Sequence, residues 1–284
     1  MSSGWGKRRK ERKGEESMFN LLRMDLYRIK RSKSPYVGLA FMLTASFLTY
    51  LFVFFLTVPE GQRLAFRLGM TELSGVREKE ILEGIDTLSL FHHTAISGGM
   101  YSILLGVITV LFVCSDFQGG FIKNIMSLCP ERWKYIGSKL ITIGIINAAL
   151  LVFSFLFHTL LNPVFHTMLP YIALGDAVLY LTLLWLETTA FAALIILICV
   201  ITRSAAAGVM ASVLLGGGII VSPLASVMSL FRAEGWIIYT IYYNINSGLF
   251  AFGTTGELRA AAVGIVFLTV YAAAASVCLT RQDI

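Results

Sequence analysis

Continuously apolar runs alternate with shorter polar segments along most of the chain. Each run has about 19 or more residues, the length that an α-helix needs to cross a hydrocarbon core of about 30 Å. Transmembrane strands would instead alternate apolar and polar positions over about ten residues. The pattern predicts an all-α membrane protein with six transmembrane helices, at residues 36–58, 95–113, 140–161, 177–201, 205–227 and 260–279.

The segment before the first run divides into two parts. Residues 1–17 are charged and nearly free of aliphatic side chains, which is typical of a disordered tail, and Met18 is a second candidate start. Residues 18–34 predict an amphipathic interfacial helix, because four apolar side chains fall within a narrow arc: Phe19, Leu22, Leu26 and Ile29. Ser34 and Pro35 then break this helix, and residues 35–284 form the predicted transmembrane domain.

Three further polar or irregular features interrupt the pattern of apolar runs. Residues 59–94 form a long, charge-rich loop with a short helical piece expected near 77–85, and this loop reads as a solvated face or as an acidic rim that attracts cations. Glycines 216–218 with Pro223 predict a bent or broken fifth helix. Residues 231–258 are too polar to span but rich in Trp and Tyr, which predicts an aromatic re-entrant segment.

Composition and charge agree with a membrane protein and set an orientation. The chain is 56% hydrophobic and 14% charged, with a mean hydropathy of +0.75, far from the roughly 25% charged residues of a soluble domain. With both termini inside, the inner segments hold 17 of the 23 Lys and Arg residues, so we expect both termini to be cytoplasmic. The net charge of +6 then suits anionic lipid headgroups and not a nucleic acid.

Known catalytic and nucleotide-binding motifs are missing. The sequence contains no G-x-x-x-x-G-K-[ST], H-E-x-x-H or G-x-S-x-G, so we expect no nucleotide site and no catalytic residue in this chain. Cys114, Cys129, Cys199 and Cys278 read as free thiols. No metal site is predicted, because the four histidines lack the spacing to carboxylates that such a site needs. They are His92, His93, His158 and His166.

Glu187 is the only acid deep inside a predicted span. A charge at a helix centre costs roughly 2.5 to 3.5 kcal/mol on insertion scales, so Glu187 should face the protein interior and be paired or protonated. The sequence leaves open whether it contacts a substrate or forms a hydrogen bond to a neighbouring helix.

The polar stretch between the second and third runs carries a resemblance. The run LFVCSDFQGGFIKNIMSLCPERWKYIGSKL is similar to the motif of permease subunits of ABC-2 type exporters, with a type V exporter-like fold. The matching positions are Asp116, Gly120, Ile122, Lys123, Asn124, Arg132, Tyr135 and Lys139. Two positions depart slightly from the family motif. Asp116 stands where the family more often has Glu, and Phe121 stands where it more often has Thr. MFNLLRMDLYRIKRSKSPYV similarly resembles the interfacial helix of short Gram-positive permeases that export peptides or lantibiotics or confer immunity to them.

This resemblance implies a coupling loop, residues 115–139, that docks on a separate ATPase subunit. The implied coupling residues are Gly120, Phe121, Ile122, Lys123, Asn124, Ile125, Arg132, Tyr135 and Lys139. It further implies two ABC ATPase subunits, a second copy of the permease or a related permease, and a bacterial cytoplasmic membrane. ATP and Mg²⁺ would bind to the partner subunit, leaving this chain without a cofactor. The expected activity is export of a peptide or another amphipathic molecule.

Three alternatives remain open at the level of sequence. In the first, the charges of the loop reflect the positive-inside rule and nothing more, and the short helix rests on lipid. A membrane sensor subunit that transports nothing would have the same spans. An intramembrane enzyme would use His92, His93 and Glu187.

Overall fold

A computed structural model describes residues 18–68, 84–122, 125, 131–230, 234–247 and 254–281. These residues form helices and connecting segments, with no β-strand among them. Five helical segments are long and apolar enough to span a membrane: α2 (Ser34–Thr57), α5 to α6 (Thr87–Gln118), α8 (Arg132–Val164), α9 (Leu174–Thr202) and α13 (Thr254–Arg281). The chain is therefore a multi-pass, all-α membrane protein.

The fifth predicted span is broken, as the glycines indicated. It consists of α10 (Ala205–Gly216) and α11 (Val221–Leu230), which are bent by 47° relative to each other, and it is a sixth span if the pair crosses as one unit. Gly218 lies between the two helices with φ of 73°, a left-handed conformation that favours glycine. The Tyr242 hydroxyl also lies where a Cβ on Gly218 would be, so glycine is required there for space as well.

The second span begins earlier than the apolar run predicts. α5 (Thr87–Phe91), the π-helical turn η2 (His92–Ile96) and the 3-10 turn η3 (Ser97–Gly99) precede α6 (Met100–Gln118). Asp86 caps α5 by accepting a hydrogen bond from the Ser89 backbone N–H at 2.6 Å. The predicted loop 59–94 thus contributes buried residues at its end, because capping allows the helix to start before hydropathy rises.

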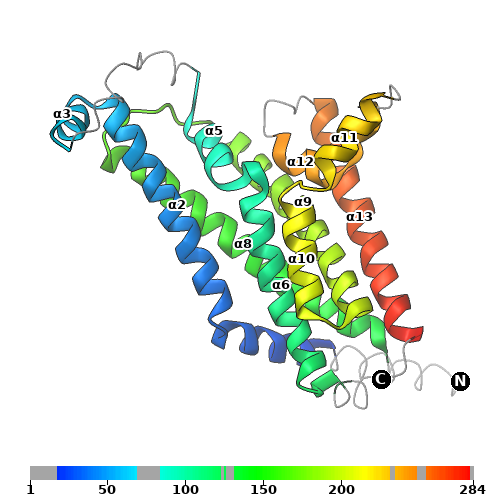
Figure 1. The fold of residues 1–284 in the computed structure, drawn as a ribbon. Coiled ribbons are helices and arrows are strands. Elements are labelled where there is room, and N and C mark those ends of the chain that lie inside the picture. Colours follow the sequence, from blue (N-terminus) through cyan, green and yellow to red (C-terminus); the bar gives the residue numbers. More distant parts are fainter. Residues whose placement is uncertain are drawn as a thin grey trace, which may run out of the picture.

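The N-terminal helix (residues 18–31) lies across one end of the bundle (Figure 1). The C-terminal end of α6 and the start of α8 lie at the same end, which we call the basic end. Ile29 and Asp25 are buried, and Leu21 and Met24 pack partly against the core. Phe19, which was predicted on the apolar arc, is 71% exposed. The buried face is therefore rotated from the predicted arc, because it is set by contacts with α6 and α8.

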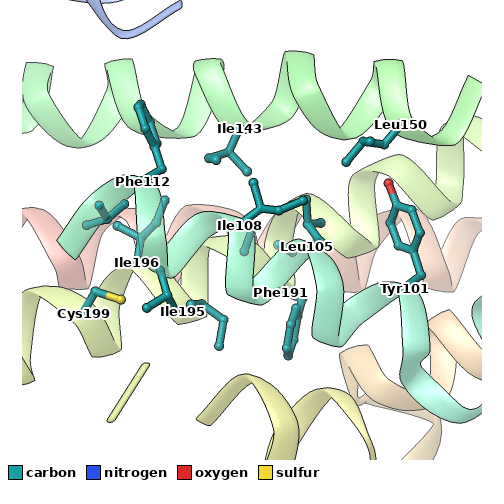
Figure 2. Packing of buried hydrophobic residues seen from close by; sticks show 14 of the residues in the cluster. Tyr101, Leu105, Ile108, Phe112, Ile143, Leu150, Phe191, Ile195, Ile196 and Cys199 are labelled. Carbon is teal, nitrogen blue, oxygen red and sulfur yellow. The ribbon is translucent and has the colours of Figure 1, made fainter. Parts of the chain in front are cut away.

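α6 runs through the centre of the bundle. Its side chains point toward α8 on one side and α9 on the other, and Tyr101, Leu105, Ile108 and Phe112 are buried among them (Figure 2). α10 packs against α6 through small residues, since a Cβ on Gly106 would lie 2.6 Å from Ser212 Oγ. Large apolar side chains remain exposed along α2 and α13, which suits contact with lipid.

Shorter helices lie at the end opposite the basic end (Figure 1). They are α3 (Pro59–Arg67), η4 (Glu234–Tyr239) and α12 (Ile241–Ser247). The last two belong to the predicted re-entrant segment, of which residues 231–233 and 248–253 lie outside the described residues. The helical piece expected near residues 77–85 falls mostly outside them too.

Candidate functional site

A buried charge cluster joins three elements at the basic end. We define it as Asp25 and Arg28 of the N-terminal helix, Asp116 of α6 and Lys139 of α8. Asp25, Asp116 and Lys139 are almost fully buried, and only Arg28 reaches the surface. Buried charges are rare in proteins unless they are paired, so this arrangement is the most specific polar feature of the described structure.

Lys139 occupies the centre of the cluster. Its Nζ lies 2.7 Å from Asp25 Oδ1 and 2.7 Å from Asp116 Oδ2. Arg28 Nη1 lies 2.5 Å from Asp116 Oδ1. Two carboxylates therefore face two cations, and the cluster as a whole is electrically neutral.

Neighbouring hydroxyl groups complete the hydrogen bonding of the carboxylates. Ser138 Oγ donates to Asp25 Oδ2 at 2.7 Å, and the Tyr135 hydroxyl donates to Asp116 Oδ2 at 3.0 Å. A buried ion pair is tolerated when such additional bonds offset the cost of removing charges from water. The cluster can hold three helix segments together, and its paired groups offer no free nucleophile or base.

Aromatic rings cover the cations of the cluster. Lys139 Nζ lies 4.1 Å from the centroid of the Phe112 ring, and the Arg28 guanidinium lies 5.0 Å from that of Phe121. Both distances are within the range of a cation–π interaction. Phe121 is 36% exposed, so it links the buried charges to the surface of the basic end.

The structure brings only some of the predicted coupling residues together. Tyr135 and Lys139 belong to the cluster or contact it, and Phe121 lies at its exposed edge. Gly120 forms the turn after α6 with φ of 65°. Ile122 and Ile125 are buried in the core of this chain, so they are not part of an exposed docking surface here.

The remaining coupling residues have other positions. Arg132 donates a hydrogen bond from Nη1 to the backbone carbonyl of Leu279, near the end of α13. Arg132 therefore stabilises the contact between α8 and α13. Lys123 and Asn124 lie outside the described residues.

Asp25 and Arg28 are functional candidates that the sequence analysis did not select. Asp25 is the only acid among residues 18–34 and lies four positions from both Leu21 and Ile29. Residues spaced by four share one face of a helix, so Asp25 is an isolated acid on an otherwise apolar face. That pattern could have identified Asp25 as a candidate from the sequence. The sequence did not reveal its partner, because Lys139 follows 114 positions later.

A second polar centre lies in the core, at Asn147 of α8. Its Oδ1 accepts a hydrogen bond from the Tyr101 hydroxyl at 2.6 Å. Its Nδ2 lies 2.8 Å from Thr188 Oγ1 and 2.9 Å from Thr189 Oγ1. Asn147 thus connects α6, α8 and α9 through neutral groups.

The histidines occupy two separate environments. His92 Nδ1 lies 2.5 Å from the Tyr180 hydroxyl, and its Nε2 lies 3.1 Å from the Asn246 carbonyl. His158 is buried between the rings of Tyr50 and Phe91, and neither of its nitrogens has a hydrogen-bond partner in the described part of the chain. No group of three or more His, Cys, Asp or Glu side chains suited to a metal ion occurs in the part of the chain that is described.

Comparisons with known proteins leave this geometry as the main guide to function. No protein-family model matches the chain, and no curated protein matches it. The protein is a multi-pass membrane protein with a neutral, buried charge cluster at its basic end.

Proposed function

We propose that this chain is the permease subunit of an ABC transporter of the ABC-2 type. A separate ATPase subunit would bind at the basic end, which would then be the cytoplasmic side of a bacterial membrane. ATP and Mg²⁺ would bind to that subunit and not to this chain. Two ATPase subunits and a second permease, identical or related, would complete the transporter.

The buried charge cluster is the observation that carries this proposal. A permease must convey a displacement at its cytoplasmic surface to helices that cross the membrane. Phe121 contacts Arg28, Arg28 pairs with Asp116 of α6, and Asp116 shares Lys139 of α8 with Asp25. A force applied at Phe121 would therefore move the N-terminal helix, α6 and α8 together.

The broken fifth span supports a pathway on one side of the bundle. α11 has no buried residue, and Leu224, Val227 and Leu230 are exposed on it. Such a surface fits a lipid boundary, a second permease or an amphipathic cargo passing between two permeases. We propose export of a peptide or another amphipathic molecule, with the α10–α11 pair facing the pathway.

Co-purification with an ATPase tests the proposal. The full chain is tagged, expressed in its source cell, extracted in mild detergent and assayed for bound ATPase, alongside a Phe121→Asp variant. Phe66→Asp is the matched control, because Phe66 is 67% exposed on α3 at the opposite end. We expect ATPase with the native chain and the control, and its loss with Phe121→Asp.

Two other results would contradict either the ATPase partner or its docking at Phe121. No ATPase with any form would favour a sensor subunit without transport. Equal ATPase with all three forms would place the docking surface elsewhere. Size-exclusion chromatography of each variant shows whether the permease itself remains folded.

The enzyme alternative has weaker support. His92 is bonded to Tyr180, which precedes Glu187 by seven residues on α9. Seven residues of helix correspond to about two turns, or roughly 10 Å. Glu187 has no hydrogen-bond partner among the described residues, so no described hydrogen bond supports a catalytic group of this carboxyl with the histidines.

A further inference from the structure

Glu187 is a buried carboxyl group near the middle of α9. Its exposed fraction is 2%, and α9 extends for more than ten residues on either side of it. A helix of this length covers the full hydrocarbon core, so Glu187 lies far from both membrane surfaces. An ionised carboxylate at that depth requires a counterion or several hydrogen-bond donors.

The structure provides neither partner. Oε1 and Oε2 of Glu187 are both without a hydrogen bond among the described residues. The carboxyl group faces α13 at Gly264, where an added Cβ would lie 3.6 Å from Glu187 Cδ and 2.7 Å from Leu186 Cγ. The two helices thus close over the carboxyl group with no space for a larger side chain.

The other buried carboxyl groups differ from Glu187 in this respect. Asp25 and Asp116 each lie 2.7 Å from the ammonium group of Lys139, and each accepts a further hydrogen bond. These two buried acids thus have a cation in direct contact, and Glu187 has none among the described residues. Where Glu187 faces α13, no described residue places a cation beside its carboxyl group.

The helices packed against α9 supply no cation at this level. α10 has no titratable side chain, and the basic residues of α8 lie in its first turns. On α13, Arg259 is five residues from Gly264 and so lies on a different face, whereas Glu257 and Tyr271 are seven residues away, or roughly 10 Å. The other titratable groups on these neighbours are Tyr135 and His158 of α8, Tyr101, Cys114 and Asp116 of α6, Cys278 and Arg281 of α13, and Tyr242 and Tyr243 of α12.

On this geometry we propose that Glu187 is a proton-binding site inside the membrane, and that it carries its proton while α9 and α13 are in contact. The neutral acid is compatible with the closed, apolar contact at Gly264, and the carboxylate is not. Release of the proton requires α9 and α13 to separate and admit water. This inference concerns the protonation of one residue and does not depend on the proposed ATPase partner.

Infrared spectroscopy of the full chain tests the proposal at neutral pH. A protonated carboxylic acid has a C=O stretching band that a carboxylate lacks, and a detergent without ester groups keeps that region clear. We expect the native spectrum to contain one such band that the Glu187→Gln variant loses. Asp176→Asn removes an exposed acid from the same helix and is the matched control, which should retain the band.

Each other result overturns the proposal. Native and Glu187→Gln spectra without a difference in this band would mean that Glu187 is ionised. A band that appears only in choline buffer and disappears when sodium or potassium is added would mean a metal-cation site. If Glu187→Gln does not fold, Glu187→Asp serves instead, and an unshifted band in that variant would assign the band to another acid.

Discussion

Lys139 of α8 places its ammonium group 2.7 Å from the Asp25 carboxylate of the N-terminal helix, although 114 residues separate them in the chain. Both side chains are buried. A helix that would otherwise rest on the membrane surface is thereby fixed to the bundle. The position of the N-terminal helix is set by this ion pair as much as by its apolar face.

Removing Lys139 should strongly destabilise the protein. Lys139→Met leaves Asp25 without its cation, and breaking a buried ion pair from one side costs about 3–5 kcal/mol. We expect a corresponding loss in the free energy of unfolding, measured with denaturant in detergent. Lys30→Met, an exposed position on the N-terminal helix, should change it by less than about 0.5 kcal/mol.

A double variant separates the ion pair from simple packing. Asp25→Asn with Lys139→Met leaves Asp116 paired with Arg28. We expect the double variant to lose less free energy of unfolding than the two single variants lose in sum. When both side chains are replaced, neither substitution leaves an unpaired buried charge. Additive losses would show that the two side chains do not stabilise each other.

Asn147 should be sensitive to an apolar replacement of similar size. Asn147→Leu leaves Tyr101 without its closest acceptor and removes the donor to Thr188 and Thr189. An unsatisfied buried polar group costs about 1–3 kcal/mol, so we expect a clear decrease in the unfolding temperature. Thr182→Val should have little effect, because this exposed hydroxyl bonds only to its own helix. An unchanged temperature for Asn147→Leu would contradict the role of this centre.

The two buried histidines should respond oppositely to the same substitution. His158→Phe removes two nitrogens that lack partners among the described residues and keeps a ring beside Tyr50 and Phe91, so the unfolding temperature should stay the same or increase. His92→Phe loses the contacts with Tyr180 and Asn246 and should decrease it. Thermal unfolding followed by light scattering compares them directly, and equal losses would mean that His158 has a polar partner in the membrane.

The contact between α6 and α10 should tolerate no added methyl group. Gly106→Ala would place Cβ 2.6 Å from Ser212 Oγ, so the helices must separate and stability should decrease. Gly137 of α8 has open space around it, and Gly137→Ala should stabilise the helix by roughly 0.5–1 kcal/mol. Ser212→Gly should partly restore the stability of Gly106→Ala. Equal effects of the two alanine substitutions would argue against close α6–α10 packing.

Hydropathy determined the membrane-spanning helices, and the glycine run indicated the break in the fifth span. Apolar runs long enough to cross a bilayer must be helical there, since lipid offers no partner to an open backbone. Three successive glycines and Pro223 indicated the bend, and in the structure Gly218 lies between α10 and α11 at positive φ. The buried residues of α10 are small and lie four positions apart, so they share one face of the helix: Gly208, Ser212 and Gly216.

Only the tertiary structure decided which polar side chains meet. Asp25, Asp116 and Lys139 are far apart in sequence, and no local pattern specifies that their helix faces converge. Burial of Ile122 against the chain's own core, and the exposure of Phe19, likewise depend on how the N-terminal helix and α6 pack. The sequence required Glu187 to face inward, but the closed contact with Gly264 of α13 decided that it has no partner. A one-dimensional pattern records the affinity of each segment for water or lipid, whereas pairing depends on distances that exist only in the folded chain.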